Sequence, residues 1–397
     1  MKNTIAGADP KKTRAFRFVI LVGVVSLFAD MTYEGARSIT GPFLGSLGAS
    51  ATIVGIVAGA GELVGYGLRL LSGYLSDRTK QYWTITIIGY AINLLAVPCL
   101  ALANRWDLAA ALVIAERLGK AIRTPARDTM LSHAAGEVGR GRGFGLHEAL
   151  DQVGAVCGPL LVAIVLSLTG NYPSSFAMLL IPAILAVSVL AAARFLYPSP
   201  QDMELTIQKS TGRFPAVFWL YLLGVGFIAA GFADYPLIAY HFGKVSSVPK
   251  EWIPVFYSVA MGVDALAALI LGYYFDKAGF PVLIGASICA AFFAPLVFFG
   301  GFWFALLGVA LWGIGMGAQE SIMRAVIADM ISSDRRGTAY GVFNSGYGIC
   351  WFIGSALMGW LYDTSIAALV AFSVVSQLMS VPVLVLVKRQ WTPKMAS

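Results

Sequence analysis

The amino-acid sequence predicts an all-α membrane protein: twelve transmembrane helices arranged as two pseudo-symmetric six-helix bundles. The 397 residues are 58% hydrophobic and only 12% charged, whereas a soluble domain carries about 25% charged residues. The apolar runs are continuous over about 20 residues, the length at which a helix crosses the hydrocarbon core. The strands of a β-barrel would instead alternate over segments of roughly ten residues. The third observation is an internal repeat, described below.

The first apolar run follows a polar, basic segment and is not followed by an A-x-A-like cleavage site. We therefore expect an uncleaved first span rather than a signal peptide. The predicted spans are residues 16–40, 50–75, 83–103, 107–132, 143–169, 174–197, 214–242, 252–275, 281–299, 302–331, 337–362 and 366–388.

The longest connection, residues 198–213, is polar and rich in turn-forming residues. It predicts the division of the chain: an N-terminal six-helix half over 1–197, a cytoplasmic linker over 198–213, and a C-terminal six-helix half over 214–397.

The distribution of Lys and Arg predicts the orientation. Outside the spans, these residues gather on the side of the two termini, and only Arg105, Lys244 and Lys250 fall on the other side. Because cytoplasmic loops carry the excess of Lys and Arg, we expect a multi-pass protein of the cell (inner) membrane with both termini cytoplasmic. The net charge of +7 then faces anionic lipid headgroups of the bilayer and indicates no nucleic-acid partner.

Three motifs of the first half recur in the second half in the same order and at nearly constant offset. Each motif and its copy are Phe28-Ala29-Asp30 with Phe232-Ala233-Asp234, Gly73-x-x-x-Asp77-Arg78 with Gly272-x-x-x-Asp276-Lys277, and Arg140-Gly141-x-x-Phe144-Gly145 with Arg336-Gly337-x-x-Tyr340-Gly341. Parallel repeated halves with a site at their interface are a transporter architecture.

The turn Gly73-Tyr74-Leu75-Ser76-Asp77-Arg78 resembles the loop signature of the major facilitator superfamily, with a degenerate copy at Gly272 to Gly279. Gly154-x-x-x-Gly158-Pro159 resembles the antiporter motif of that family, and Arg117 lies where the family often has a buried arginine. The resemblance covers the whole chain. It implies the major facilitator fold and a drug/proton-antiporter-like transporter.

Charged residues in the fourth and fifth spans mark the predicted site. Glu116, Lys120, Arg123 and Arg127 share one helical face, and Glu148, Asp151 and Gln152 share another. Charges inside a span persist when they pair or line a watery cavity. We expect the two faces to meet, either as a static ion-pair network or as one that opens and re-pairs as the halves rock.

Asp30 and Glu34 form an i,i+4 carboxylate pair, and two close carboxylates resist double ionisation. Such a pair suits proton coupling; the alternative is an acidic pair neutralised by Arg37 and Arg117. The predicted proton-coupling residues are Asp30, Glu34, Glu148 and Asp151. The predicted substrate cavity is lined by Arg117, Lys120, Arg123, Gln152, Asp234, Asp264, Glu320 and Arg324.

The resemblance implies that the loop signature latches the cytoplasmic side. The predicted cytoplasmic gate comprises Gly73, Asp77, Arg78, Arg127, Asp128 and Asp276. Gly154, Gly158 and Pro159 are expected to bend the fifth span, since proline removes a backbone hydrogen bond.

Several function classes are not supported by the sequence. It contains no Gly-x-x-x-x-Gly-Lys-Ser/Thr nucleotide loop, and its His and Cys residues lack metal-ligand spacing. We therefore expect no cofactor, no metal and no enzyme activity. The leading hypothesis is a monomeric, proton-coupled exporter or antiporter of a small molecule that works by rocker-switch alternating access. Two alternatives are a proton symporter importing an anionic metabolite and a non-transporting receptor or lipid-handling protein on the same fold.

Overall fold

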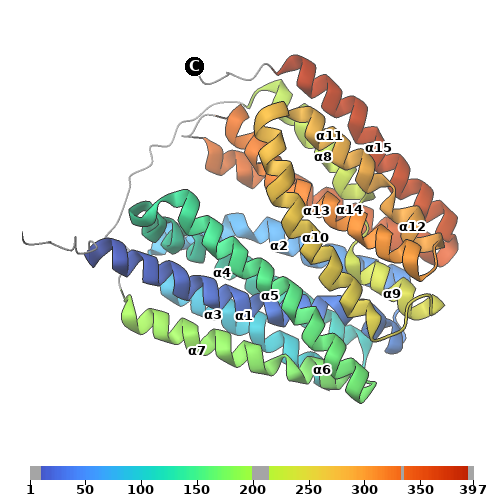
Figure 1. The fold of residues 1–397 in the computed structure, drawn as a ribbon, viewed down its shortest axis with the longest axis horizontal. Helices are drawn as coiled ribbons and strands as arrows, with labels where there is room; N and C mark the ends of the chain where they lie inside the picture. The colour runs from blue at the N-terminus through green and yellow to red at the C-terminus, as the bar shows by residue number, and fades with distance from the viewer. Residues whose placement is uncertain (1–9, 199–213, 332–334, 392–397) are drawn as a thin grey trace, which may run out of the picture.

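The computed structural model describes residues 10–198, 214–331 and 335–391, and it is helical almost throughout these ranges (Figure 1). The N-terminal bundle consists of α1 (Pro10–Ser46), α2 (Ala51–Thr79), α3 (Tyr82–Cys99) continued by a 3-10 turn (Leu100–Leu102), α4 (Trp106–Val138), α5 (Arg140–Thr169), α6 (Tyr172–Met178) and α7 (Leu180–Leu196). The C-terminal bundle consists of α8 (Ala216–Gly231), α9 (Tyr235–Val245), α10 (Trp252–Ala278), α11 (Phe280–Ala291), α12 (Phe293–Phe299), α13 (Phe302–Met330), α14 (Arg336–Thr364) and α15 (Ile366–Gln390).

These elements make twelve helical spans in the described ranges, because α6 with α7, α8 with α9, and α11 with α12 are each one span in two pieces. The predicted fold class is confirmed. Ten of the described spans are long and apolar enough to cross a membrane. α4 and α14 are not among the ten, and α4 carries the row of charged residues from Glu116 to Asp128.

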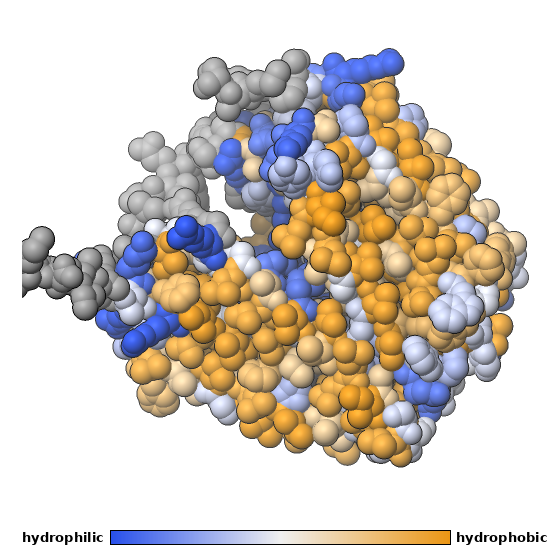
Figure 2. Space-filling view, viewed as in Figure 1, coloured by the Kyte–Doolittle hydropathy of each residue, from blue (hydrophilic) through white to orange (hydrophobic). Residues whose placement is uncertain are grey.

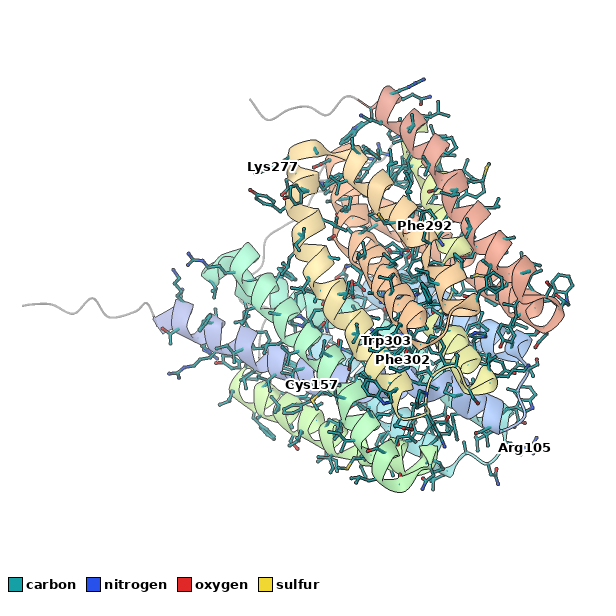
Figure 3. The ribbon with its side chains drawn as sticks, turned by 45° about the vertical axis from the view of Figure 1, so that its right-hand side comes forward. Arg105, Cys157, Lys277, Phe292, Phe302 and Trp303 are labelled. Atoms are coloured by element: carbon teal, nitrogen blue, oxygen red, sulfur yellow. The ribbon has the colours of Figure 1, made fainter. Side chains whose placement is uncertain are left out.

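The two bundles are inclined to one another (Figure 1). They lie closest at the end where α1 and α9 both finish, which we name the far end. They diverge toward the end where α1 begins and α15 finishes, which we name the termini end. In the turned view of Figure 3, Lys277 lies at the termini end and Arg105 at the far end.

A hollow with hydrophilic walls opens between the two bundles at the termini end, whereas most of the surrounding surface is hydrophobic (Figure 2). An apolar outer surface suits a protein whose solvent is lipid, and polar side chains at membrane depth then face the interior or a watery cavity.

Small residues bring the bundles into close contact. A Cβ atom added at Gly55 of α2 would collide with the Ser355 carbonyl of α14, and one added at Gly59 would lie 3.0 Å from the Phe352 Cα. Such small-residue stripes allow helix backbones to approach closely in membranes.

The same packing occurs between α1 and α5. Gly154 and Gly158 of α5 lie against the carbonyls of Leu27 and Met31 of α1. α5 remains one helix through Pro159, so the expected bend stays a prediction. Gly154 and Gly158 allow close packing of α5 against α1. The linker predicted over 198–213 lies outside the described residues except for Pro198.

Candidate functional site

An arginine of the N-terminal bundle joins the two bundles near the centre of the protein. The Nη2 atom of Arg37 lies 2.9 Å from Glu62 Oε1 and 2.9 Å from Asp234 Oδ1. Glu62 belongs to α2, and it also lies 3.4 Å from the Arg117 guanidinium. The predicted cavity residues Arg117 and Asp234 are therefore linked through Arg37 and Glu62, of which Glu62 had no role in the site predicted from the sequence.

Asp234 reaches this position because its span is interrupted. α8 ends at Gly231, the backbone through Asp234 is extended, and α9 begins at Tyr235. Asp234 thus lies at the N-terminus of α9, where the helix dipole favours an anion. Its second oxygen accepts hydrogen bonds from Trp351 Nε1 at 2.7 Å and Ser355 Oγ at 3.0 Å. The carboxylate is 1% exposed and fully bonded.

A cavity of about 30 Å³ adjoins this network, with Arg37, Glu62, Arg117 and Asp234 in its wall. A volume of this size holds one or two water molecules. The network therefore has space beside it for water and no room for a larger ligand.

Glu34 forms a second connection between the bundles. It accepts a hydrogen bond of 2.5 Å from the Tyr257 hydroxyl of α10, and its other oxygen lies 3.9 Å from Lys120 Nζ. The same ammonium lies 3.9 Å from the centre of the Tyr33 ring, a distance typical of a cation–π contact. Glu34 is thus bound by α4 and α10.

Asp30 instead faces α5. Its Cβ lies 3.0 Å from the position that a Cβ on Gly154 would take, and its carboxylate is in electrostatic contact with Asp151. One oxygen of each carboxylate, Asp30 Oδ1 and Asp151 Oδ1, is buried with no hydrogen-bond partner among the described atoms. Asp30 and Asp151 therefore each keep an unpartnered buried oxygen, on the neighbouring helices α1 and α5.

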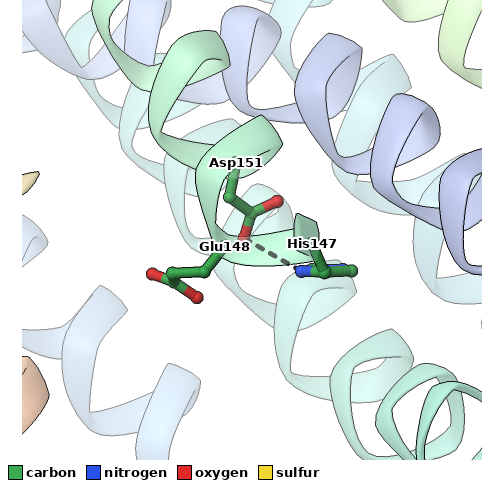
Figure 4. Close-up of side chains that lie close together, drawn as sticks. All are labelled: His147, Glu148 and Asp151. Atoms are coloured by element: carbon green, nitrogen blue, oxygen red, sulfur yellow. Dashed lines mark ion pairs between the residues drawn. The ribbon is translucent and has the colours of Figure 1, made fainter. Parts of the chain in front are cut away.

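His147 lies beside Asp151, one of these two carboxylates (Figure 4). Its Nδ1 lies 4.0 Å from Asp151 Oδ2, and its Nε2 lies 3.0 Å from Ser26 Oγ on α1. The ligand atoms of His147, Glu148 and Asp151 lie within 4.8 Å of one another, close enough for a metal ion. Arg127 also bonds Ser26 Oγ, at 3.0 Å, and its positive charge opposes a metal cation there.

The arrangement around His147 suits the movement of a proton, because imidazole can both accept and donate one. This histidine was absent from the predicted site because it lacks metal-ligand spacing in the sequence. The i,i+4 spacing of His147 and Asp151 is the feature of the sequence that could have indicated a role for this histidine.

The basic face of α4 does not pair with α5 in the expected way. Arg127 forms its ion pair with the adjacent Asp128, at 2.8 Å. Arg123 is 1% exposed, lies over the ring of Tyr90 at 4.3 Å, and has two guanidinium nitrogens without a partner among the described atoms. Arg123 therefore lies behind the wall of the hollow. Glu116 is likewise internal, bonded by Asn93 at 2.7 Å.

The remaining predicted cavity residues, Gln152, Asp264, Glu320 and Arg324, lie near Glu148, which was predicted as a proton-coupling residue. Glu320 and Arg324 of α13 and Glu148 of α5 are exposed, and Gln152 is half-buried. Asp264 of α10 is in electrostatic contact with both Glu320 and Glu148.

The predicted gate residues lie at the termini end, where the hollow opens. Asp77, Arg78 and Asp276 are all exposed there. A Cβ atom added at Gly73 would lie 3.5 Å from the Cβ of Pro125 on α4. The exposure of the charged gate residues accompanies the separation of the bundles at this end.

A contact that the sequence did not indicate closes the far end. Asp363, at the end of α14, accepts hydrogen bonds from the backbone N–H groups of Ala51 at 3.2 Å and Thr52 at 2.8 Å, and from the Thr52 hydroxyl at 2.7 Å. Burial by itself would raise the pKa of Asp363, but these bonds and the charge of Lys244 hold the pKa below its ordinary value. A carboxylate of one bundle thus binds the N-terminus of a helix in the other.

Twelve spans in two inclined bundles, with charged residues between them, define a membrane transporter fold. The sequence matches the description Major Facilitator Superfamily over residues 22–355 and 235–394. The chain belongs to this superfamily, and it is a multi-pass membrane transporter.

Relatives and solved structures extend this comparison. An uncharacterized protein of Mycobacterium tuberculosis is 44% identical over 382 residues, covering 94% of this chain and 93% of its own. An uncharacterized MFS-type transporter of Methanocaldococcus jannaschii is 25% identical over 357 residues, covering 87% and 89%. The nucleoside transporter NupG has a TM-score of 0.72 at 14% identity, with 95% and 100% of the chains covered. A peptide transporter POT in complex with sulfate has a TM-score of 0.73 at 12% identity, covering 96% and 98%. At such identities these structures share the fold alone.

Proposed function

We propose that this protein is a proton-coupled secondary transporter that exports a small molecule across the cell (inner) membrane as a monomer. In this proposal both termini are cytoplasmic, so the hollow at the termini end is open to the cytoplasm. The single observation that carries the proposal is the asymmetry between the ends: polar walls are open at one end, while inter-bundle bonds close the other.

Alternating access requires those bonds to break. The bundles, proposed as residues 1–197 and 214–397 joined by the cytoplasmic linker, would rock about their interface. The Arg37–Asp234, Tyr257–Glu34 and Asp363–Thr52 contacts would then separate. The gate residues Asp77, Arg78 and Asp276 would approach their partners at the termini end. Rocking of one bundle against another around a fixed site is the motion that repeated halves permit.

The proposed proton site is the Asp30–Asp151 pair with His147 beside it. Their unpartnered oxygens, Asp30 Oδ1 and Asp151 Oδ1, can share one proton more readily than they can carry two charges, since close carboxylates resist double ionisation. Glu148, exposed to the hollow, would deliver protons from the cytoplasmic side. Because Asp30 is also in electrostatic contact with Lys120, a change in its charge alters the hold of Lys120 on Glu34 and thereby on the C-terminal bundle.

Reconstituted proteoliposomes test this proposal. An imposed pH gradient should drive cargo in the direction opposite to protons, and Asp30→Asn and Asp151→Asn should each uncouple flux from the gradient while exchange without a gradient partly persists. Full proton coupling in both variants would remove the pair from the mechanism.

A second candidate is a proton symporter importing an anionic metabolite. The observation favouring it is Lys120, whose side chain is 21% exposed and offers a positive charge at the centre of the interface. Cargo that moves with the protons, rather than against them, would select this candidate. If no cargo in a broad metabolite panel moves under any gradient, both candidates fail.

A further inference from the structure

Asp264 is a buried carboxylate beside the hollow. It is 2% exposed, and its Oδ1 atom has no hydrogen-bond partner among the described atoms. The three strongest electrostatic influences on it come from other carboxylates: Glu320, Glu148 and Glu34. Burial and these neighbouring acids both oppose a negative charge on Asp264.

Other buried carboxylates of the interface are held by cations within the protein. Asp234 binds Arg37, and Glu62 binds Arg37 and Arg117. A buried charge without a counter-charge is costly. No ion pair holds Asp264 among the described residues, so its carboxylate is compensated either by a proton or by a positive charge from outside the chain.

The surroundings of Asp264 are rich in hydrogen-bond acceptors. The Gln152 amide of α5 lies against Asp264, and its Oε1 atom is also buried without a partner among the described atoms. Glu148 of α5 and Glu320 of α13 are exposed nearby, and Arg324 of α13 is the basic residue that acts most strongly on both. An ammonium group supplies three N–H donors and one positive charge, which matches this set of acceptors.

We propose that Asp264, Gln152, Glu148 and Glu320 bind the ammonium group of an organic amine, and that this amine is the cargo. The inference rests on the proposed transport function and adds the chemical class of the substrate. The acceptors come from both bundles, α5 on one side and α10 with α13 on the other. A bound amine therefore relieves repulsion between Glu148 and the two acids opposite it. A ligand that interacts better with one conformation shifts the population toward it, so the amine favours closure of the termini end.

Binding to the purified full-length protein in lipid nanodiscs tests the site. The probes are phenethylamine, octylamine and spermidine, each compared with a neutral or anionic counterpart: phenethyl alcohol and 3-phenylpropanoate, octanol and octanoate, and 1,8-octanediol. The readout is the concentration dependence of the thermal unfolding temperature at pH 7. At least one amine should stabilise the protein while its counterparts do not.

Asp264→Asn should weaken the apparent affinity for that amine at least about tenfold, since a bond to a charged group is lost. The amide has nearly the same shape, which matters because Gly313 and Gly317 of α13 pack directly on the backbone at residue 264. Glu251→Gln, which changes an exposed acid at the far end, is the matched control and should bind like the unaltered protein. If Asp264→Asn does not fold, Glu320→Gln is used with the same expectation.

Equal stabilisation by amines and their uncharged counterparts would overturn the proposal, as would unchanged amine affinity in the folded Asp264 or Glu320 variant. No stabilisation by any of the three amines would also overturn it and would leave a proton as the occupant of Asp264. Because binding is measured without a gradient, amine binding with no flux in proteoliposomes would refute the transport mechanism and leave the amine site standing.

Discussion

Removal of the Asp363 carboxylate should shift the protein toward the conformation open at the far end. Asp363→Ala deletes the acceptor of two backbone N–H groups and of the Thr52 hydroxyl. These bonds join the end of α14 to the start of α2, so they exist only while the far end is closed. The change therefore destabilises the conformation described here relative to its alternative.

The magnitude follows from the role of Asp363 as a capping residue supplied by the other bundle. Loss of an N-terminal cap costs about 1 kcal/mol, and the position is exposed, which screens the charge. Ser50 still caps α2 through its own bond to the Ile53 N–H, at 3.3 Å, so the helix itself should persist. A change of about 1 kcal/mol shifts the ratio of the two conformations about fivefold.

Electron–electron resonance distances between spin labels at positions 104 and 364 would measure this ratio, because the two positions lie at the far end in different bundles. Asp107→Ala is the matched control. Asp107 is an exposed acid at the same end whose partner, Arg105, lies in its own bundle at 2.6 Å. The reasoning is refuted if the long-distance population is the same in Asp363→Ala as in the control.

The same contact predicts a pH dependence. Because the pKa of Asp363 is held below its ordinary value of 3.8, the contact is fully present above that pH and is lost only as the pH falls through the lowered folded-state value. Titration of Asp363 should therefore not change the distances between the spin labels from about pH 5 to 8.

Two further variants examine the interface between the bundles. Asp234→Asn leaves the buried charge of Arg37 with one of its two carboxylate partners removed. Because breaking a buried ion pair costs about 3–5 kcal/mol, both transport and the unfolding temperature should fall. An unchanged unfolding temperature would contradict the structural role of Asp234. Gly55→Leu should force α2 away from α14 and abolish transport. Gly65→Ala should retain transport, because no atom lies within 4 Å of the added Cβ. Equal flux in the two variants would argue against close packing at Gly55.

The acidic residues of α1 separate what spacing predicts from what packing adds. The i,i+4 spacing predicts that Asp30 and Glu34 share one side of their helix. It does not reveal that Asp30 meets Asp151 of α5 while Glu34 accepts a bond from Tyr257 of α10. Spacing fixes the angular relation of two side chains on their own helix, but their partners depend on which helices pack against each side.

Asp363 and Arg123 illustrate the same limit. Asp363 belongs to no motif, and its role depends on α2 beginning beside the end of α14. Arg123 shares a helical face with Lys120 and Arg127, yet it is packed over Tyr90 and has no access to the hollow. Neighbouring positions on one face can therefore differ completely in exposure once a second layer of helices covers part of that face.

The membrane class, the twelve spans and the superfamily indicated by the loop motifs could all be predicted without coordinates. These properties depend on local hydrophobicity and on short motifs, and neither requires knowledge of distant contacts. Which charges meet, which end is open and which glycines hold helices together became known from the packed bundles. Those features depend on side chains separated by as many as 312 residues, as in the bond from Ala51 to Asp363, which only the packing of one bundle against the other brings within reach.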